Sequence, residues 1–120
     1  MADERPGVWV GHVAMAAADP KASHDFYVDA GMRTVFRGDD MAILELRGGT
    51  HLLLFRGDAE TGPAPFDLMV EDLDAMHGDL SGRGLAVSDI SRGEIHDAFT
   101  LTDPDGHEIT VQNSHVEGIV

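Results

Sequence analysis

The beginning of the chain changes from an alternating pattern to a helical one. In residues 8–15, successive side chains fall on opposite faces of an extended chain, which predicts a strand. Asp19 then has the side chain of a helix N-cap, Pro20 suits the first helical position, and Gly31 suits the residue that follows a helix. Apolar side chains recur at every fourth position, at Ala22, Phe26 and Ala30. We therefore predict a helix that packs on a sheet through this stripe.

Three strand-like segments follow the helix and complete a first module. They cover residues 32–38, 41–47 and 50–56. The connections between them are short and contain glycine, at Gly38-Asp39-Asp40 and Gly48-Gly49, which predicts antiparallel hairpins. Residues 8–57 are therefore expected to form a βαβββ module.

The same pattern recurs after a linker rich in proline and glycine, residues 58–65. Asp72 and Gly84 lie 53 positions after Asp19 and Gly31, so the order of strand, Asp cap, helix and glycine is repeated. Further strand-like segments follow, with an Asp-Pro-Asp-Gly turn between the last two: residues 85–90, 95–102 and 107–112. Residues 66–113 are predicted to form a second βαβββ module, and the tail is assigned no element.

The composition is that of one globular domain. The chain has 120 residues, of which 42% are hydrophobic and 25% charged. Cysteine is absent, which excludes disulfides, thiolate metal ligands and a cysteine nucleophile. The acidic N-terminus does not have the pattern of a signal peptide, and no apolar run approaches the roughly 18 residues of a membrane span. The expected location is therefore the cytoplasm, without membrane contact.

The charge balance is strongly acidic, with 22 acidic residues against 8 basic ones and a formal net charge of −14. A field of this sign repels nucleic acid, which excludes a nucleic-acid partner. Two interpretations of the charge remain open. It is either a solvated acidic surface or part of a pocket that attracts a cationic ligand.

Four segments distributed over nearly the whole chain carry a resemblance to a known superfamily: Gly11-His12-Val13, Phe26-Tyr27-Val28-Asp29-Ala30-Gly31, Leu68-Met69-Val70-Glu71-Asp72-Leu73-Asp74 and Asp103-Pro104-Asp105-Gly106. Together with the two βαβββ modules, they resemble the vicinal oxygen chelate superfamily. That group includes glyoxalase I, extradiol dioxygenases, fosfomycin-resistance enzymes and bleomycin-resistance proteins. The resemblance implies an α+β fold whose mixed sheets curl into a cup with the helices outside. It also implies a homodimer and leaves open whether the modules pair within one chain or between chains.

Many members of that superfamily hold a divalent metal with four side chains, whereas others bind small molecules without metal. Carried over onto this chain, the four ligand positions are His12, Leu53, Pro65 and Thr110. Of these, only His12 can bind a metal through its side chain in the usual way. The resemblance therefore argues against glyoxalase I activity, which needs a carboxylate ligand as a base. It also argues against extradiol dioxygenase chemistry, whose two histidines and one carboxylate are not in register.

Strand alternation offers a second set of side chains on the cup face, because residues two apart share a face. The predicted ligand-binding residues are His12, His51, Leu53, Phe55, Asp67, Glu108 and Thr110. Among these, His12, His51 and Glu108 are candidate ligands of a divalent zinc, iron, nickel or manganese ion. The alternative is a polar pocket without metal. This alternative is favoured by distance, because His51 and Glu108 each lie one pleat from the ligand position of the superfamily. One pleat is about 6.6 Å along the strand, which is long compared with a metal bond of about 2 Å.

The remaining histidines are interpreted as structural or exposed rather than catalytic: His24, His77, His96, His107 and His115. The two on the predicted helices, His24 and His77, are expected on solvated or boundary faces. His107 begins the last strand on the face opposite Glu108.

Three functions remain open from the sequence. The first is a glyoxalase/bleomycin resistance/dioxygenase-type protein that binds or transforms a small molecule in the cup, with or without a metal acting as a Lewis acid. The second is a metal-free protein that sequesters a cationic drug or metabolite. The third is a structural or regulatory homodimer with an empty cup.

Overall fold

The first module is a four-stranded sheet with one helix on one side. The computed structural model describes residues 4–117. The elements of this module are β1 (His12–Ala17), α1 (Pro20–Asp29), β2 (Arg33–Arg37), β3 (Met41–Glu45), a single 3-10 turn (Arg47–Gly49) and β4 (His51–Arg56). The strand order is β1-β4-β3-β2, with β1 parallel to β4 and with antiparallel hairpins β2–β3 and β3–β4. Both predicted hairpins are confirmed.

The second module repeats this plan with shorter strands. Its elements are β5 (Gly62–Pro63), β6 (Leu68–Val70), α2 (Leu73–Gly82), β7 (Ala86–Val87), β8 (Ala98–Thr102) and β9 (His107–Asn113). The strand order is β5-β9-β8-β7, and β6 also pairs with β9 in the parallel direction. The segment predicted as a plain linker, residues 58–65, thus contains a strand. It pairs because the N–H groups of Gly62 and Ala64 donate to the carbonyls of Gly106 and Glu108.

Several strand boundaries differ from the predicted ones, and two of them show how a partner strand sets a boundary. The segment predicted as 8–15 begins at His12, directly opposite the first residue of β4, His51. The segment predicted as 85–90 is reduced to β7, which pairs with β8 through Ala86 and Val87. Alternation along a single segment contains no information about where its neighbour ends.

The repeated Asp and Gly positions do what the sequence predicts. The carboxylate of Asp19 accepts from the N–H of Ala22 at 3.3 Å, and that of Asp72 accepts from the N–H of Ala75 at 3.0 Å. Both helices are followed by a glycine with positive φ, 113° at Gly31 and 80° at Gly84. A side chain would strain this backbone conformation, so glycine is favoured there. The two modules therefore share their helix start and stop signals.

The core lies on the helix-facing side of each sheet. In the first sheet it consists of Met15, Ala17, Ala42, Leu44, Leu52 and Leu54, and in the second of Phe99, Leu101, Ile109 and Val111. The two helices pack on these faces, and His77 of α2 stacks edge-on against Phe99 with ring centroids 4.9 Å apart. Because side chains alternate along a strand, the opposite face of each sheet carries a different set of residues. Within residues 4–117, no helix is both long and apolar enough to cross a membrane.

The buried face of α1 is rotated from the predicted one. Ala22 is exposed and Phe26 is half-buried, whereas Ser23, His24 and Tyr27 are buried. The predicted stripe was wrong at Ala22, whereas Ala30 is buried and Phe26 packs against the core. The face is rotated because the buried polar residues of this helix have partners inside the protein, and apolar periodicity cannot detect such partners.

His24 is a buried histidine, which corrects the predicted solvated or boundary position. Its Nε2 lies 2.8 Å from Oγ1 of Thr34 on β2, and its Nδ1 lies 2.8 Å from Oδ1 of Asp25. The Asp25 carboxylate also accepts from Nε and Nη2 of Arg37 at 2.9 and 2.8 Å. This network fastens α1 to the edge strand β2.

The same network makes the stability of the folded protein depend on pH in the acidic range. The bonds from Arg37 and His24 hold the pKa of Asp25 well below its ordinary value of 3.8. A lowered pKa in the folded state means that the stabilisation is present above the ordinary value and is lost as the pH falls through the folded one. We therefore expect the free energy of unfolding to decrease below about pH 4, and Asp25→Asn to show a shallower decrease. Urea unfolding measured across this range tests the slope. An equal slope in Asp25→Asn and in the exposed control Asp58→Asn would contradict the expectation.

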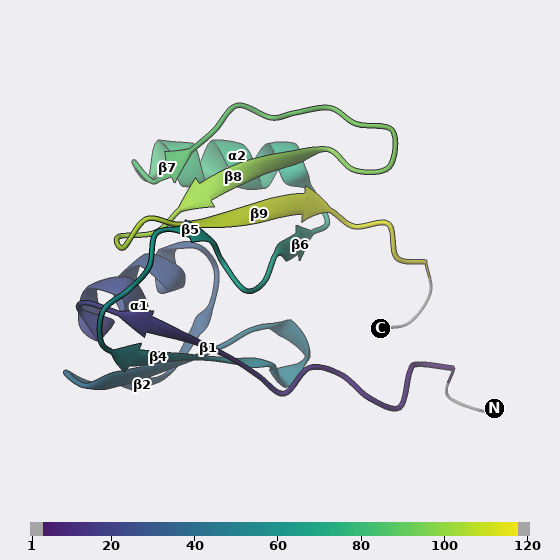
Figure 1. Ribbon diagram of the computed structural model, residues 1–120. Coiled ribbons are helices and arrows are strands. Elements are labelled where there is room, and N and C mark those ends of the chain that lie inside the picture. Colours follow the sequence, from purple (N-terminus) through teal and green to yellow (C-terminus); the bar gives the residue numbers. More distant parts are fainter. Residues whose placement is uncertain (1–3, 118–120) are drawn as a thin grey trace.

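The two modules meet where α1 contacts the turn between β8 and β9 (Figure 1). The hydroxyl of Tyr27 donates to Oδ2 of Asp103 at 2.6 Å. The N–H of Ala18 and the hydroxyl of Ser23 lie 3.3 and 3.4 Å from the carboxylate oxygens of Asp105. Figure 1 shows the two sheets as separate layers, and they are not closed into a barrel.

Candidate functional site

A row of polar side chains crosses the face of the first sheet that is opposite α1, here called the open face. The strand registers place His12 of β1 beside His51 of β4, His51 beside Glu45 of β3, and Glu45 beside Arg33 of β2. All four side chains lie on the same side because their strands are in register and side chains alternate. The polar row therefore extends across all four strands.

Hydrogen bonds join Arg33, Glu45 and His51 in this row. Nε2 of His51 lies 3.0 Å from Oε2 of Glu45, and Nη2 of Arg33 donates to Oε1 of the same carboxylate. The Arg33 guanidinium, and then the His51 ring, lower the pKa of Glu45. The rings of His12 and His51 have centroids 5.7 Å apart and are tilted by 48°. Glu45 is thus an ionised acceptor that orients His51.

Apolar side chains cover the rest of the open face and form what we call the apolar floor. Its residues, by alternation and register, are Ala14, Ala16, Phe36, Met41, Ile43, Leu53 and Phe55. Phe36 and Phe55 are 51% and 44% exposed. A contiguous apolar surface of this kind usually marks a binding site for a ligand or a partner. The open face therefore combines an apolar floor with a polar row at one end.

The corresponding face of the second sheet is mostly polar and carries carboxylates, with exposed Met69 beside Gln112. Glu108 and Thr110 of β9 are exposed, and Nε2 of Gln112 donates to Oδ2 of Asp67 at 3.0 Å. The side chains of Thr100 and Thr102 on β8 share this side, because Thr100 pairs with Thr110 and Thr102 with Glu108. We call these six polar residues the acidic face.

The predicted ligand-binding residues are divided between these two faces. His12, His51, Leu53 and Phe55 lie together on the open face. Asp67, Glu108 and Thr110 lie on the acidic face of the other module. Among the described residues, the donor atoms of His12, His51 and Glu108 do not form a group within 4.8 Å of one another. One chain thus brings two of the three candidate metal ligands together.

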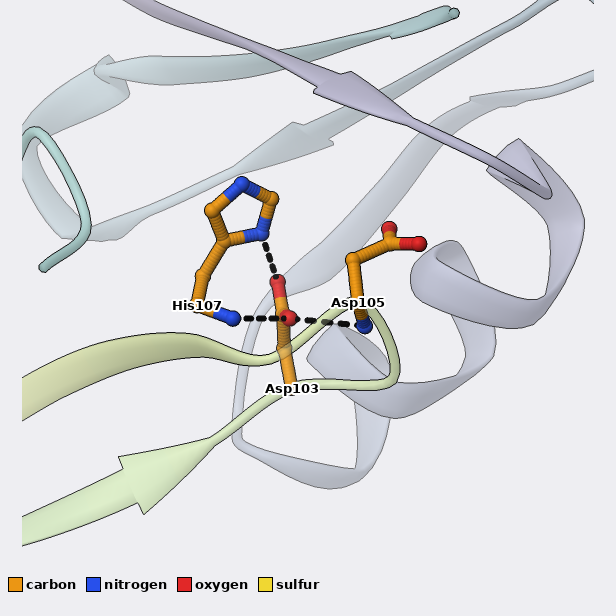
Figure 2. A group of neighbouring side chains, drawn as sticks. All are labelled: Asp103, Asp105 and His107. Atoms are coloured by element: carbon orange, nitrogen blue, oxygen red, sulfur yellow. Dashed lines mark hydrogen bonds and ion pairs between the residues drawn. The ribbon is translucent and has the colours of Figure 1, made fainter. Parts of the chain in front are cut away.

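Within residues 4–117, one group does have three metal-type donors within 4.8 Å: Asp103, Asp105 and His107. Figure 2 shows that the Asp103 carboxylate points at His107 and at the turn backbone, while the Asp105 carboxylate turns toward α1. One oxygen of Asp103 accepts from the N–H groups of Asp105 and His107 at 3.0 and 2.9 Å. The other accepts from Nδ1 of His107 at 2.8 Å and from Tyr27 at 2.6 Å.

These hydrogen bonds decide how the group fits a metal ion. The donor types and spacing are compatible with a divalent cation. However, both Asp103 oxygens and Nδ1 of His107 are already bonded inside the protein, so a bound ion would have to displace several hydrogen bonds. As the chain is folded, the group serves as a junction between the modules rather than as an open metal centre.

A separate hollow of about 370 Å³ lies between the modules. Its lining includes Val13 and Leu52 of the first sheet and Pro65, Phe66 and Asp67 of the second module. Val13 and Leu52 alternate with His12 and His51, so the hollow is on the helix-facing side. It is therefore distinct from the open face, and Asp67 is the predicted site residue that contributes to it.

Glu45 and Arg33 were not predicted as site residues. The sequence does contain a signal for Glu45, because closing the hairpin around Gly48-Gly49 pairs Glu45 with His51. The position of Arg33 depends on the β2–β3 register, which shifts between Thr34 and Phe36. Such a bulge changes which side chains share a face and is not visible in the sequence pattern.

Comparison with known proteins agrees with this architecture. The family model described as a glyoxalase-like domain matches residues 12–112. No curated protein shows significant sequence similarity to this chain. A lactoylglutathione lyase from Agrobacterium tumefaciens is 20% identical with a TM-score of 0.77, covering 96% of this chain and 100% of its own.

Two further solved structures have the same fold. The oxidase ChaP-H2 is 21% identical with a TM-score of 0.74, covering 91% of this chain and 95% of its own. TnmS3, an antibiotic binding protein from Streptomyces sp. CB03234, is 21% identical with a TM-score of 0.72, covering 91% of this chain and 98% of its own. These identities support a shared fold and not a shared substrate. The solved structures share the fold that the repeated modules predicted, and the chain belongs to the glyoxalase-like domain family.

Proposed function

We propose that this protein binds a flat, largely apolar small molecule on the open face, with the polar row contacting one end of the molecule. The observation that carries the proposal is the exposed apolar floor beside the polar row, in which Arg33, Glu45 and His51 are hydrogen-bonded and the His12 ring lies next to that of His51. Small-molecule sites typically combine an apolar lining with a few oriented polar groups. The antibiotic-binding and oxidase neighbours share the fold that would support such a site.

We further propose that a second copy of the chain completes the site. The open face has two histidines and Arg33 at one end, whereas the acidic face carries Asp67 and Glu108. Because Glu45 already pairs with Arg33 on the open face, the acidic face would add two carboxylates, Asp67 and Glu108, next to the histidines of the polar row. In a two-fold dimer, the open face of each copy would lie against the acidic face of the other and form two equivalent cups.

The dimer is tested by placing a charge on the apolar floor. Leu53→Glu is expected to weaken dimerisation by at least about 100-fold, because a carboxylate would be buried opposite an acidic face. Analytical ultracentrifugation over a range of concentrations measures this change. Ala22→Glu, at an exposed position of α1, is the matched control. A wild-type protein that stays monomeric at high concentration would contradict the dimer.

Ligand binding is tested at the aromatic part of the floor. Phe55→Ala is expected to lower the affinity for a planar aromatic by about tenfold, because a stacking surface is lost. Fluorescence titration with 2-naphthol measures the change, and Val28→Ala on the exposed side of α1 is the control. Equal affinity of wild type, Phe55→Ala and Val28→Ala would place the ligand elsewhere.

A cationic ligand is the second candidate, favoured by the acidic face and by the net charge of −14. Binding of a cation should weaken as salt increases, whereas binding of a neutral aromatic should not. Titration of a basic glycopeptide and of 2-naphthol at low and high salt separates the two candidates.

A divalent zinc, iron, nickel or manganese ion at this site would need donors from two copies of the chain. His12 and His51 of one copy would be joined by Glu108 of the other, and the ion would supply Lewis-acid chemistry to ligand oxygens. Metal analysis of protein purified without chelator decides this alternative. Less than about 0.2 equivalents, with no thermal shift on adding metal, rejects it. A bound ion that is lost in both His12→Ala and Glu108→Ala supports it.

A further inference from the structure

We infer that the ligand contacts His51 through a hydroxyl group, and that Glu45 is the positioning residue that imposes this preference by fixing the proton of His51 on Nε2. The inference rests on the proposed ligand site at the open face. It identifies the ligand as a planar aromatic with a phenolic or enolic hydroxyl, as opposed to one that presents only ether, quinone or carboxylate oxygens.

The first step concerns the atom of His51 that carries the proton. An ionised carboxylate can only accept hydrogen bonds. Oε1 of Glu45 accepts from Arg33, and Oε2 lies 3.0 Å from Nε2 of His51. Because the Arg33 guanidinium donates to Oε1, the Glu45 carboxylate is held in its ionised, accepting form. Nε2 of His51 must therefore donate, and in the neutral ring Nδ1 is left as an acceptor.

The second step concerns what can occupy this acceptor. In the described part of the chain, the side-chain hydrogen bond recorded for His51 is the one through Nε2. The charged or titratable groups around the ring are Glu45 on β3, Arg33 beyond it on β2, and His12 on β1. The side chain of His51 is 31% exposed, so Nδ1 can be solvated in the free protein. A ligand that covers it must supply a hydrogen-bond donor or leave the acceptor unsatisfied.

The third step is the consequence for selectivity. A site that is built to bond a ligand hydroxyl discriminates strongly against an analogue that lacks it, because a buried polar group would then be unpaired. The apolar floor beside His51 offers the aromatic part of the ligand little other polar contact. Hydroxyl and methyl ether forms of one aromatic ring system therefore make a matched pair of probes.

The binding experiment compares 2-naphthol with 2-methoxynaphthalene. Wild-type protein is expected to bind the naphthol at least about tenfold more tightly than the ether. In Glu45→Gln, Arg33 would retain the amide oxygen, so the amide NH₂ would face His51. Nε2 would then become the acceptor and the proton would move to Nδ1. The preference for the naphthol should therefore disappear or reverse, although the side chain has almost the same shape.

The tautomer is measured directly by ¹⁵N NMR of the imidazole rings at about pH 8, where an ordinary histidine is neutral. His51 is expected as the Nε2–H form in wild type and as the Nδ1–H form in Glu45→Gln. Two other histidines provide internal controls. Nε2 of His77 bonds the carbonyl of Ser88, and Nδ1 of His107 bonds Asp103, so these two rings should keep opposite tautomers in both proteins.

The outcomes separate the inference from the proposed function. If neither naphthalene binds, the proposed ligand site fails. If both bind wild type equally well, or if the His51 tautomer is the same in Glu45→Gln, the site stands and the inference is overturned. Should Glu45→Gln fail to fold, His51→Phe replaces it: this variant keeps a flat ring and is expected to bind the two probes equally. A retained preference for the naphthol in His51→Phe would overturn the inference.

Discussion

Replacing Asp103 with alanine is expected to lower the free energy of unfolding by about 3–5 kcal/mol. The side chain is buried, and its two oxygens accept from Tyr27, from the His107 ring, and from the N–H groups of Asp105 and His107. Alanine would leave these donors without their acceptor inside the protein, where each unsatisfied group is costly. Urea unfolding followed by circular dichroism measures the change.

Asp105→Ala is the matched control, because it alters the same turn. Asp105 is only partly buried, and its contacts with Ala18 and Ser23 are long, at 3.3 and 3.4 Å. We expect this substitution to cost less than about 1 kcal/mol. Equal losses in the two variants would show that turn propensity, and not the buried hydrogen bonds, determines the effect.

The second large effect is expected at alkaline pH. The chain contains a single tyrosine, Tyr27. Burial, and then the hydrogen bond to Asp103, raise the pKa of Tyr27 far above its ordinary value of 10.0. A raised folded pKa means that the associated stability is present below the ordinary value and is lost as the pH rises beyond it. Tyrosinate should therefore appear only when the protein unfolds.

This expectation has a direct spectroscopic test. The ultraviolet absorbance of tyrosinate and the far-ultraviolet circular dichroism are recorded in the same alkaline titration, and the two transitions are expected to coincide. Tyr27→Phe should unfold at alkaline pH without the absorbance change. A gradual rise of tyrosinate near pH 10 with unchanged circular dichroism would mean that Tyr27 is accessible in the folded protein.

Much of the fold could be predicted from the sequence because its signals are local. Asp19 and Asp72 cap helices, and Gly31 and Gly84 end them in both modules. Each signal depends on a few neighbouring residues, so a repeat at fixed spacing makes it more informative. The two βαβββ modules and their hairpins follow from such signals.

The orientation of α1 could not be predicted for the opposite reason. Its buried face is set by Tyr27 and His24, whose partners are Asp103 in the other module and Thr34 in β2. Apolar periodicity instead favoured Phe26, which is half-buried. Polar groups that are buried with distant partners contribute to a helix face without contributing to its hydrophobic pattern.

The candidate site divides in the same way. Alternation correctly groups His12, His51, Leu53 and Phe55, because these residues belong to two paired strands. Alternation does not predict where Glu108 lies relative to this group. It describes the two faces of one strand and contains no information about how one module is placed against the other. Whether these two groups meet across a dimer is what the Leu53→Glu experiment tests.

The open face also has a consequence for how the protein behaves in solution. A sheet with exposed Phe36 and Phe55 next to an exposed edge strand is a surface on which chains can associate indiscriminately. The net charge of −14 opposes such contacts by mutual repulsion. The acidic composition would then disfavour indiscriminate association of chains whose open face is not yet covered by a second copy. High salt should screen this charge repulsion and promote self-association at concentrations that do not yet affect the fold.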